Sequence, residues 1–469
     1  MRWLLVFLVA AGMAEPAAAQ ARPPADTMRV TLDGAVQRAL EQGTDMRLAR
    51  AGVLDARGQV RQALAAALPQ VTGSLTYTRQ FASIFQGVEG GDTSDIGKVF
   101  KNSPFGAANA WNLQVQASQL LWSGGKVGAA LSAARSFRQV ASLQQSETEA
   151  DVTLRAKQAY WNAALQGRLL AIAVQNLDQA RQHLREVRLY RQAGTRADYD
   201  LLRAQVDAAN QEPPVVQARN AYDIAVLDLK RLLSIPADQA LALETALESP
   251  DATIPVLASD SLGSAERPGL AAADATVREY EKLVTVARAD RWPTLSVSTT
   301  YNEQVFPADV FPGGSDVFKH GWNGEVKLSF PIFLGFRTVG AVQQARARLA
   351  RAEAERDQAR RQVDLEVTRA RGEVARARAL LAARRETVHW AARAQHLAGV
   401  RYTNGMATQL DVTDARVAAQ QAEVNEVQAT RDYLVALATL ERALGRPVPV
   451  VRRPIEQVAQ AFNVKDARP

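Results

Sequence analysis

The segment that decides the fold occurs twice in this chain. The first copy reads Trp111-Asn-Leu-Gln-Val-Gln-Ala117, and the second reads Trp322-Asn-Gly-Glu-Val-Lys-Leu328. In both copies apolar residues alternate with polar ones over much of the segment, which is typical of a β-strand with one apolar and one polar face. The offset between the copies is 211 residues (322 − 111), and it holds without a gap to Pro236 and Pro447. The chain is therefore an internal duplication.

Upstream the duplication continues with a different offset. Pro69 pairs with Pro293 and Tyr77 pairs with Tyr301, which gives 224 residues (293 − 69). The difference of 13 residues (224 − 211) falls in the segment 81–110, which is rich in Gly, Asp and Ser. Length variation of this kind is typical of exposed loops. We therefore expect a loop between the two strands of each half.

Each half is predicted to contain a helix, a strand, a loop, a strand, a very long helix, a sharp turn and a shorter helix. The strand pairs are expected at about 70–81 with 111–122, and at about 294–306 with 322–333. Long helices are expected from about 126 to 192 and from about 337 to 403, because neither range contains a proline. At about 1.5 Å per residue each would reach roughly 100 Å. Helices this long must pack on each other or on other copies of the chain.

The duplication also defines the domain organisation. Residues 1–21 read as a secretory signal peptide, because Arg2 precedes a short apolar run and small residues follow it. The expected order is a signal peptide at 1–21, a first repeat at 22–235, a crossover at 236–268, a second repeat at 269–447 and a tail at 448–469. The mature protein is therefore predicted to be exported.

Composition excludes several classes of function. The chain has no cysteine, so we expect neither a disulfide nor a lipid anchor. Its 56 basic and 49 acidic residues alternate along helical segments, whereas nucleic-acid binding needs a basic stripe. His389 and His396 are too far apart on a helix to share a metal ion. No phosphate loop, nucleophile elbow or zinc-protease motif occurs, so neither an enzyme nor a cofactor is expected.

Four strands in one chain predict an oligomer. Strands with one apolar and one polar face fit a sheet between lipid and water, but an open sheet edge cannot face hydrocarbon. Two copies would give 8 strands and three would give 12, and an eight-stranded barrel is filled by its own side chains. A trimer is therefore the arrangement that leaves an open interior.

Aromatic residues lie near the predicted strand ends, and they have two interpretations. They fit the girdles that membrane barrels place at the lipid–water interface. They also fit ordinary strand packing, since aromatic residues favour sheets. The residues concerned are Tyr77, Phe81, Trp111, Trp122, Tyr301, Trp322 and Phe333.

The second sharp turn resembles a known family. It reads Tyr402-Thr-Asn-Gly405-Met-Ala-Thr-Gln-Leu-Asp411-Val-Thr-Asp414-Ala, and it is similar to the TolC family of outer-membrane efflux proteins. The resemblance covers about Leu32 to Pro447. It implies a homotrimer with a 12-stranded β-barrel in the outer membrane of a Gram-negative bacterium, continued by an α-helical barrel through the periplasm. A periplasmic adaptor (membrane fusion) protein and an inner-membrane pump would dock at the helical tip.

The same resemblance implies a gate at that tip. Family gates use a tyrosine that matches Tyr402 and an aspartate that matches Asp200. The family's gate arginine is absent, because its position is Ala407, but the matching position of the first repeat is Arg196. We therefore expect Arg196 to supply the restraining charge.

Asp411 and Asp414 match the two aspartates at the family's constriction, and three copies would form a ring of carboxylates that attracts cations. The local alternative is helix capping, because Thr408-x-x-Asp411 has the form of a capping box. The glycines Gly194 and Gly405 mark the two sharp turns.

One difference between the repeats is Pro213-Pro214, which follows the first turn. The matching residues of the second repeat are Val424 and Asn425. Because a proline inside a helix removes a hydrogen bond, we expect a kink in the first half only.

The function predicted from these patterns is a passive export tunnel, with the energy supplied by the pump. The alternative is a periplasmic coiled-coil scaffold without channel activity. Fractionation would separate the two, because only the tunnel predicts a trimer in the outer membrane.

Overall fold

A computed structural model describes residues 27–82, 107–195, 197–244, 247, 254–257, 267–314, 317–447 and 450–453. The predicted signal peptide, most of the segment 81–110 and Arg196 lie outside these residues.

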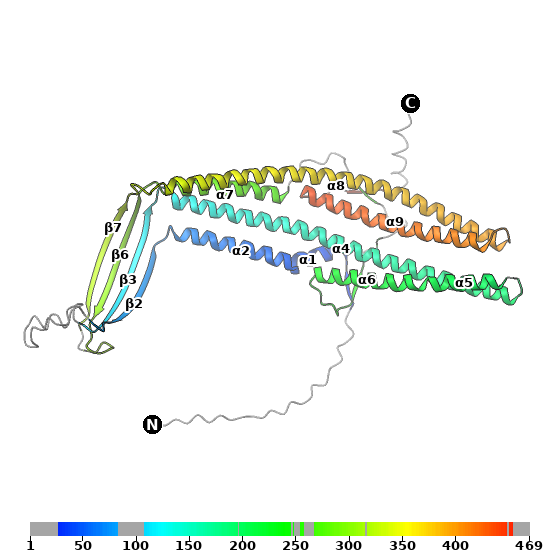
Figure 1. Cartoon of the computed structure of the whole chain (residues 1–469), viewed down its shortest axis with the longest axis horizontal. Coiled ribbons are helices and arrows are strands. Elements are labelled where there is room, and N and C mark those ends of the chain that lie inside the picture. The colour runs from blue at the N-terminus through cyan, green and yellow to red at the C-terminus, as the bar shows by residue number, and fades with distance from the viewer. Residues whose placement is uncertain are drawn as a thin grey trace, which may run out of the picture.

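The molecule is elongated, with a β-sheet at one end and helices that run from it to two hairpin turns at the other end (Figure 1). The helices are α1 (Leu32–Gln42), α2 (Thr44–Ala65), α4 (Lys126–Gln192), α5 (Asp198–Asn210), α6 (Glu212–Leu232), α7 (Pro268–Ala289), α8 (Arg337–Thr403) and α9 (Gln409–Leu444). The strands are β1 (Met28–Val30), β2 (Gln70–Arg79), β3 (Asn109–Trp122), β4 (Leu241–Leu243), β5 (Ile254–Leu257), β6 (Thr294–Val305), β7 (Lys319–Ser329) and β8 (Val450–Arg453).

The element bounds reproduce the duplication. Helices α4 and α8 have 67 residues each, and their bounds agree with the ranges predicted from the sequence. Helices α2 and α7 have 22 residues each and are related by the upstream offset. Strand β7 differs from the prediction, since it spans Lys319–Ser329 rather than 322–333. Pro331 has no N–H to donate, which prevents the ladder from continuing.

The large sheet is antiparallel, with the strand order β2-β3-β6-β7. Gln70 lies opposite Ser118 in the first hairpin, and Thr294 lies opposite Ser329 in the second. These two pairs are related by the sequence offsets of 224 and 211, so the hairpins share one register. Strands β2 and β7 are the open edges of the sheet within the described chain.

The register sorts the side chains onto two unlike faces. One face is mostly apolar; it carries Val71, Leu75, Tyr77, Leu113, Val115, Ala117, Leu295, Val297, Tyr301, Trp322, Val326 and Leu328, together with the polar Gln119, Thr299, Glu303 and His320. The other carries Thr72, Ser74, Thr76, Asn112, Gln114, Gln116, Ser296, Ser298, Thr300, Asn323, Glu325 and Lys327. The helices cover neither face (Figure 1). Apolar side chains such as Val71 (68% exposed) and Val326 (71%) are therefore largely exposed in the single chain.

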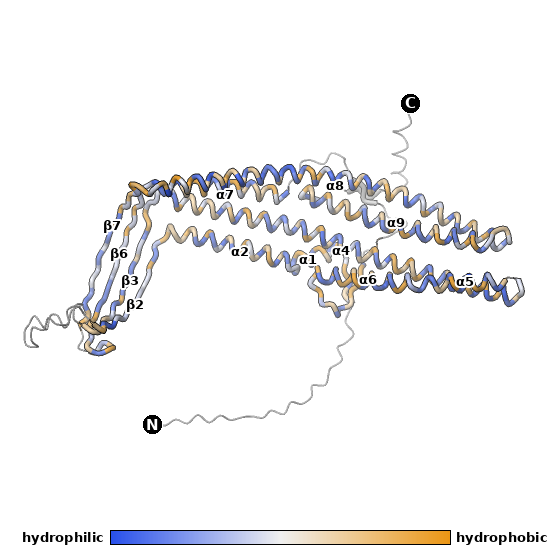
Figure 2. The backbone as a smooth tube through the Cα atoms, viewed as in Figure 1, coloured by the Kyte–Doolittle hydropathy of each residue, from blue (hydrophilic) through white to orange (hydrophobic). Residues whose placement is uncertain are grey.

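Helices α8 and α9 pack along a seam of small and branched residues. On α8 the buried positions recur every three or four residues, at Val363, Val367, Ala370, Val374, Ala377 and Leu381. They pack with Ala429, Tyr433, Ala436, Leu437 and Leu440 of α9. This spacing is the left-handed coiled-coil pattern, in which small residues let the two helices approach closely. Hydrophobic and hydrophilic residues are interspersed along both long helices (Figure 2). Within the described part of the chain, no helix combines the length and the apolarity that a membrane crossing requires.

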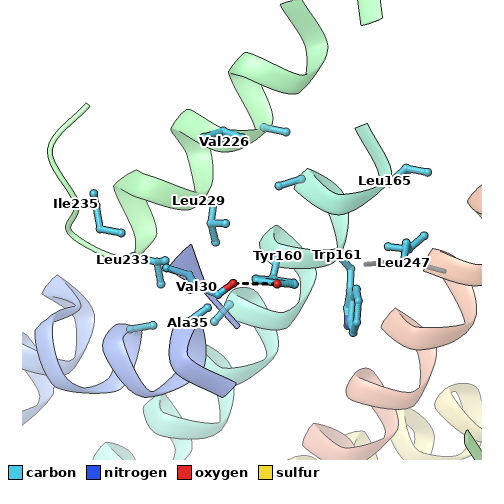
Figure 3. Close-up of a cluster of buried hydrophobic side chains, with 14 of the residues drawn as sticks. Val30, Ala35, Tyr160, Trp161, Leu165, Val226, Leu229, Leu233, Ile235 and Leu247 are labelled. Atoms are coloured by element: carbon cyan, nitrogen blue, oxygen red, sulfur yellow. Dashed lines mark hydrogen bonds between the residues drawn. The ribbon is translucent and has the colours of Figure 1, made fainter. Parts of the chain in front are cut away.

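The main core lies midway along the molecule. Tyr160 of α4 is fully buried, and its hydroxyl donates to the backbone carbonyl of Val30 at 3.1 Å (Figure 3). Leu229 and Leu233 from the end of α6 pack into the same cluster. Strand β1 pairs in parallel with β4, so this cluster ties the start of the first repeat to the crossover that follows the repeat.

An ion-pair network joins four helices at the junction where α9 ends and α7 begins. Arg442 donates to Asp151 at 2.7 Å, to Glu366 at 3.0 Å and to Glu147 at 3.3 Å. Arg267 also pairs with Glu147 (2.8 Å) and with Glu366. Burial opposes the ionisation of Glu366, but hydrogen bonds from Gln362 and Arg267 and the nearby arginine charges outweigh it and lower its pKa.

The first half is broken where the sequence predicts it. Helix α5 ends at Asn210, and α6 begins at Glu212 with Pro213-Pro214 in its first turn. Helix α9 runs through the corresponding region without interruption. Proline is tolerated in the first turn of a helix because the N–H groups there have no intrahelical acceptor.

Candidate functional site

The two hairpin turns at the end of the helices have the same backbone geometry. Gly194 and Gly405 both adopt the left-handed conformation, with φ of 76° and 71°. The residue after each glycine closes the helix, since Thr195 N–H donates to the Tyr190 carbonyl at 2.9 Å and Met406 N–H to the Arg401 carbonyl at 2.7 Å. A residue with a side chain would be strained at either glycine. The two predicted turn glycines are therefore the residues that let the chain reverse its direction at each hairpin.

Tyr402 lies in the last turn of α8 and is buried, with 7% of its surface exposed. Its ring packs on His183 of α4, with centroids 6.3 Å apart. The side-chain amide of Gln409, at the start of α9, lies 3.3 Å from a ring nitrogen of the same histidine. His183 thus contacts both arms of the α8–α9 hairpin.

A second link between the hairpins is the ion pair of Asp207 on α5 with Arg416 on α9. The side chains are 19% and 9% exposed, so the pair is largely shielded from water. Ala208 and Ala419 on the same two helices are buried beside it. Our sequence reasoning missed this pair: a charge within the small-residue face of each helix singles out the two residues, but it does not show that they meet.

The other predicted gate residues lie on the first hairpin. Asp200 is in the first turn of α5, where it is half-buried and its backbone N–H donates to the Ala197 carbonyl at 3.2 Å. Arg196, the residue expected to supply the restraining charge, lies outside the described residues. The structure therefore places Asp200 and Tyr402 on the two separate hairpins of the tip.

Asp411 forms the capping box that the sequence allowed. Its carboxylate accepts from the Thr408 N–H at 2.7 Å and from the Thr408 hydroxyl at 2.8 Å, while its own N–H donates to that hydroxyl oxygen at 3.3 Å. The hydrogen bond from the Thr408 backbone, followed by the one from its side chain, lowers the pKa of Asp411. Asp414 is exposed on the same side of α9. Both carboxylates lie at the tip, and Asp411 is engaged locally.

The tip offers contacts between hairpins rather than a pocket for chemistry. Among the described residues, no three His, Asp or Glu side chains cluster so as to hold a metal ion. The cross-hairpin contacts are instead an edge-to-face ring contact and a shielded ion pair. Such contacts can hold two helical arms together or release them.

The fold and the tip define a class of protein, namely a duplicated chain of long helical hairpins that end in a two-faced four-stranded sheet. Residues 35–234 and 261–446 match the outer membrane efflux protein family, and the chain belongs to this family. It is 24% identical over 420 residues to the outer membrane efflux protein BepC of Brucella suis biovar 1, which covers 89% of this chain and 85% of BepC. It is 27% identical over 373 residues to CyaE of Bordetella pertussis (78% and 74%).

The fold is similar to that of solved outer-membrane channels. The Campylobacter jejuni CmeC outer membrane channel superposes with a TM-score of 0.70 at 18% identity, covering 92% of this chain and 89% of CmeC. The family resemblance expected from the second turn is thereby confirmed.

Proposed function

We propose that this chain is the protomer of a trimeric outer-membrane channel that exports small molecules or proteins from a tripartite efflux or type I secretion system. The observation that carries the proposal is the uncovered sheet with one apolar and one polar face. In a water-soluble protein the apolar face would be buried against another layer. A 12-stranded barrel built from three copies would turn that face to lipid and the polar face to a water-filled lumen.

The dimensions of the sheet support this placement. Strand β6 has 12 residues, which at about 3.3 Å each gives roughly 40 Å, and a tilt of about 45° reduces its height to about 28 Å. Aromatic residues occur at both ends of the strands. Tyr77 packs on Trp111 at 5.0 Å near the loops, and Trp122 packs on Trp292 at 6.4 Å near the helices. These two levels favour the girdle interpretation.

The helices would continue the barrel through the periplasm. A helix of 67 residues spans about 100 Å. Its far end would be the closable tip, with Tyr402, Asp200 and Arg196 as gate residues. Asp411 and Asp414 of three copies would form a cation-attracting ring of six carboxylates. An adaptor protein and an inner-membrane pump would dock there and supply the energy, so the channel itself needs neither cofactor nor catalytic residues.

The test is the single-channel conductance of the purified protein in a planar bilayer, with a divalent cation added to the tip side. We expect a small conductance that the cation blocks, and less block in Asp411→Asn/Asp414→Asn. Thr408→Val is the matched control, because it removes the hydroxyl from the capping box but keeps both charges.

The outcomes separate the alternatives. Conductance without block would keep the channel and leave the aspartates as capping residues. A stable trimer that conducts nothing would contradict the channel and favour the scaffold.

A further inference from the structure

We propose that the two open sheet edges, β7 of one copy and β2 of the next, pair in one defined register with Ser329 opposite Ser74 of the neighbouring copy. The inference rests on the proposed trimer and specifies how its barrel closes. It follows from the internal duplication, because the chain already contains one junction between repeats.

That junction is the pairing of β3 with β6, in which Ser118 lies opposite Ser298. Adding 211 to a β3 residue gives its β7 equivalent, and subtracting 224 from a β6 residue gives its β2 equivalent. Ser118 thus becomes Ser329, and Ser298 becomes Ser74. The same offsets relate the registers of the two hairpins, so they describe the structure as well as the sequence.

The derived register passes a test that it could have failed. A shift by one residue would turn every side chain of an edge strand to the opposite face. Instead Leu328 falls opposite Leu75 and Val326 opposite Tyr77, all on the apolar face. The polar face continues in the same way, with Ser329 opposite Ser74. Both faces of the sheet are therefore continuous across the junction between copies.

A contact beside the sheet is likewise present in only one of its two repeat-related positions within the chain. Gly124 is covered by Trp292, and a Cβ added at Gly124 would lie 2.5 Å from the Trp292 Cβ. The equivalent glycine, Gly335, has no heavy atom within 4 Å of such a Cβ. The residue equivalent to Trp292 is Leu68, whose side chain is 52% exposed. The register places Leu68 of the neighbouring copy beside Gly335, which pairs an open glycine with an uncovered leucine.

Cysteine pairs test the register directly, because the chain has no cysteine of its own. The test variant is Ser74→Cys/Ser329→Cys, oxidised in the detergent-solubilised protein. Directly opposed strand residues have Cα atoms about 4.5 to 5.5 Å apart, within the range of a disulfide. The positive control is Ser118→Cys/Ser298→Cys, which replaces the equivalent pair inside one chain. The slipped control is Thr72→Cys/Ser329→Cys, whose diagonal separation of about 7 to 8 Å is beyond that range.

We expect the test variant to form a covalent trimer that is lost on reduction. The positive control should form a disulfide within one chain, and the slipped control should form no cross-link. A native trimer that fails to cross-link, or that cross-links through Thr72→Cys instead, would overturn the register while leaving the channel proposal standing. A monomeric protein in native mass spectrometry, with no disulfide between chains, would overturn the proposed trimer and this inference together.

Discussion

The substitution Arg416→Ala is expected to loosen the helical tip, because it removes one partner of the ion pair between α5 and α9. The Asp207 carboxylate would stay where it is, only 19% exposed and without its guanidinium. That carboxylate is more fully hydrated when the two hairpins separate. The substitution therefore favours any state in which α5 moves away from α9.

The size of the effect can be worked from the burial of the pair. Removing one partner of a buried ion pair costs about 3–5 kcal/mol. Because Asp207 keeps some access to water, we take the lower end, about 3 kcal/mol for each copy. At about 1.4 kcal/mol for each factor of ten, the ratio of open to closed tips rises about 100-fold.

Single-channel recording measures that ratio directly as the open fraction at fixed voltage. Three variants form a double-mutant cycle, namely Arg416→Ala, Asp207→Ala and the two combined. If the pair holds the tip closed, the double variant is less open than Arg416→Ala alone, because removing Asp207 also removes the unpaired buried charge. The charge reversal Asp207→Arg/Arg416→Asp should return the open fraction toward that of the unmodified protein.

Two results would refute this reasoning. Arg416→Ala channels as closed as the unmodified ones would show that the pair carries no closing energy. Independent effects of the two alanine substitutions, adding in the double variant, would show that each residue acts through some other contact.

Three further predictions concern the rest of the chain. The variant Pro213→Val/Pro214→Asn, which introduces the residues of the second repeat, should join α5 to α6 and slow amide hydrogen exchange at residues 209–212. Unchanged exchange would show that the two prolines do not cause the break. The pKa of the Glu366 carboxyl is lower in the folded protein than in the unfolded chain, so the ionised carboxylate stabilises the fold above its unfolded pKa and this stabilisation is lost as the pH falls through the folded pKa. The melting temperature should therefore fall below about pH 4.5, and it should fall less in Glu366→Gln. Gly124→Ala should destabilise the protein by at least 1 kcal/mol in chemical denaturation, since φ is +60° and the new Cβ would meet Trp292; an unchanged midpoint would refute this.

The long helices could be predicted because their signals are local. The range 126–192 contains no proline and repeats apolar residues at helical spacing, and α4 has those bounds. The helix break at Pro213-Pro214 depends equally on local chemistry. The end of β7 was placed too far along the chain, because the alternation continues through Phe330 while Pro331 cannot extend the ladder.

The tip contacts could not be predicted from one chain by the same means. Asp207 and Arg416 are more than 200 positions apart, and nothing in the spacing shows that α5 and α9 meet at that height. The partners of Tyr402 were equally hidden, because His183 lies 219 positions away on α4 (402 − 183). Only the duplication carried long-range information, and it related equivalent positions rather than positions in contact.

Two equivalent helix junctions show how far the duplication extends: the first lies where α6 ends and α2 begins, and the second where α9 ends and α7 begins. At the second junction Arg267 and Arg442 are held by carboxylates of α4 and α8. The position equivalent to Arg267 in the first repeat is Gly43, and it borders a cavity of about 810 Å³. The charge of Glu366 is also reversed there, because its equivalent is Arg155, which pairs with Asp45 at 2.5 Å. At these junctions the helices are thus repeated, but the ion pairs are not.

This asymmetry has a physical reason if the chain works as a ring. The second junction is enclosed by α4 and α8 of the same chain, whereas within the described residues the first has only α4 as its long-helix neighbour. The uncovered side of the first junction exposes Leu48, Leu54, Ile224 and Leu227, between 47% and 66%. On α8, Leu365 is likewise 42% exposed. The offsets that bring Ser329 to Ser74 also bring α8 of one copy alongside α2 and α6 of the next. In the proposed trimer the apolar side chains left open in one chain would face the neighbouring copy, which would complete the first junction.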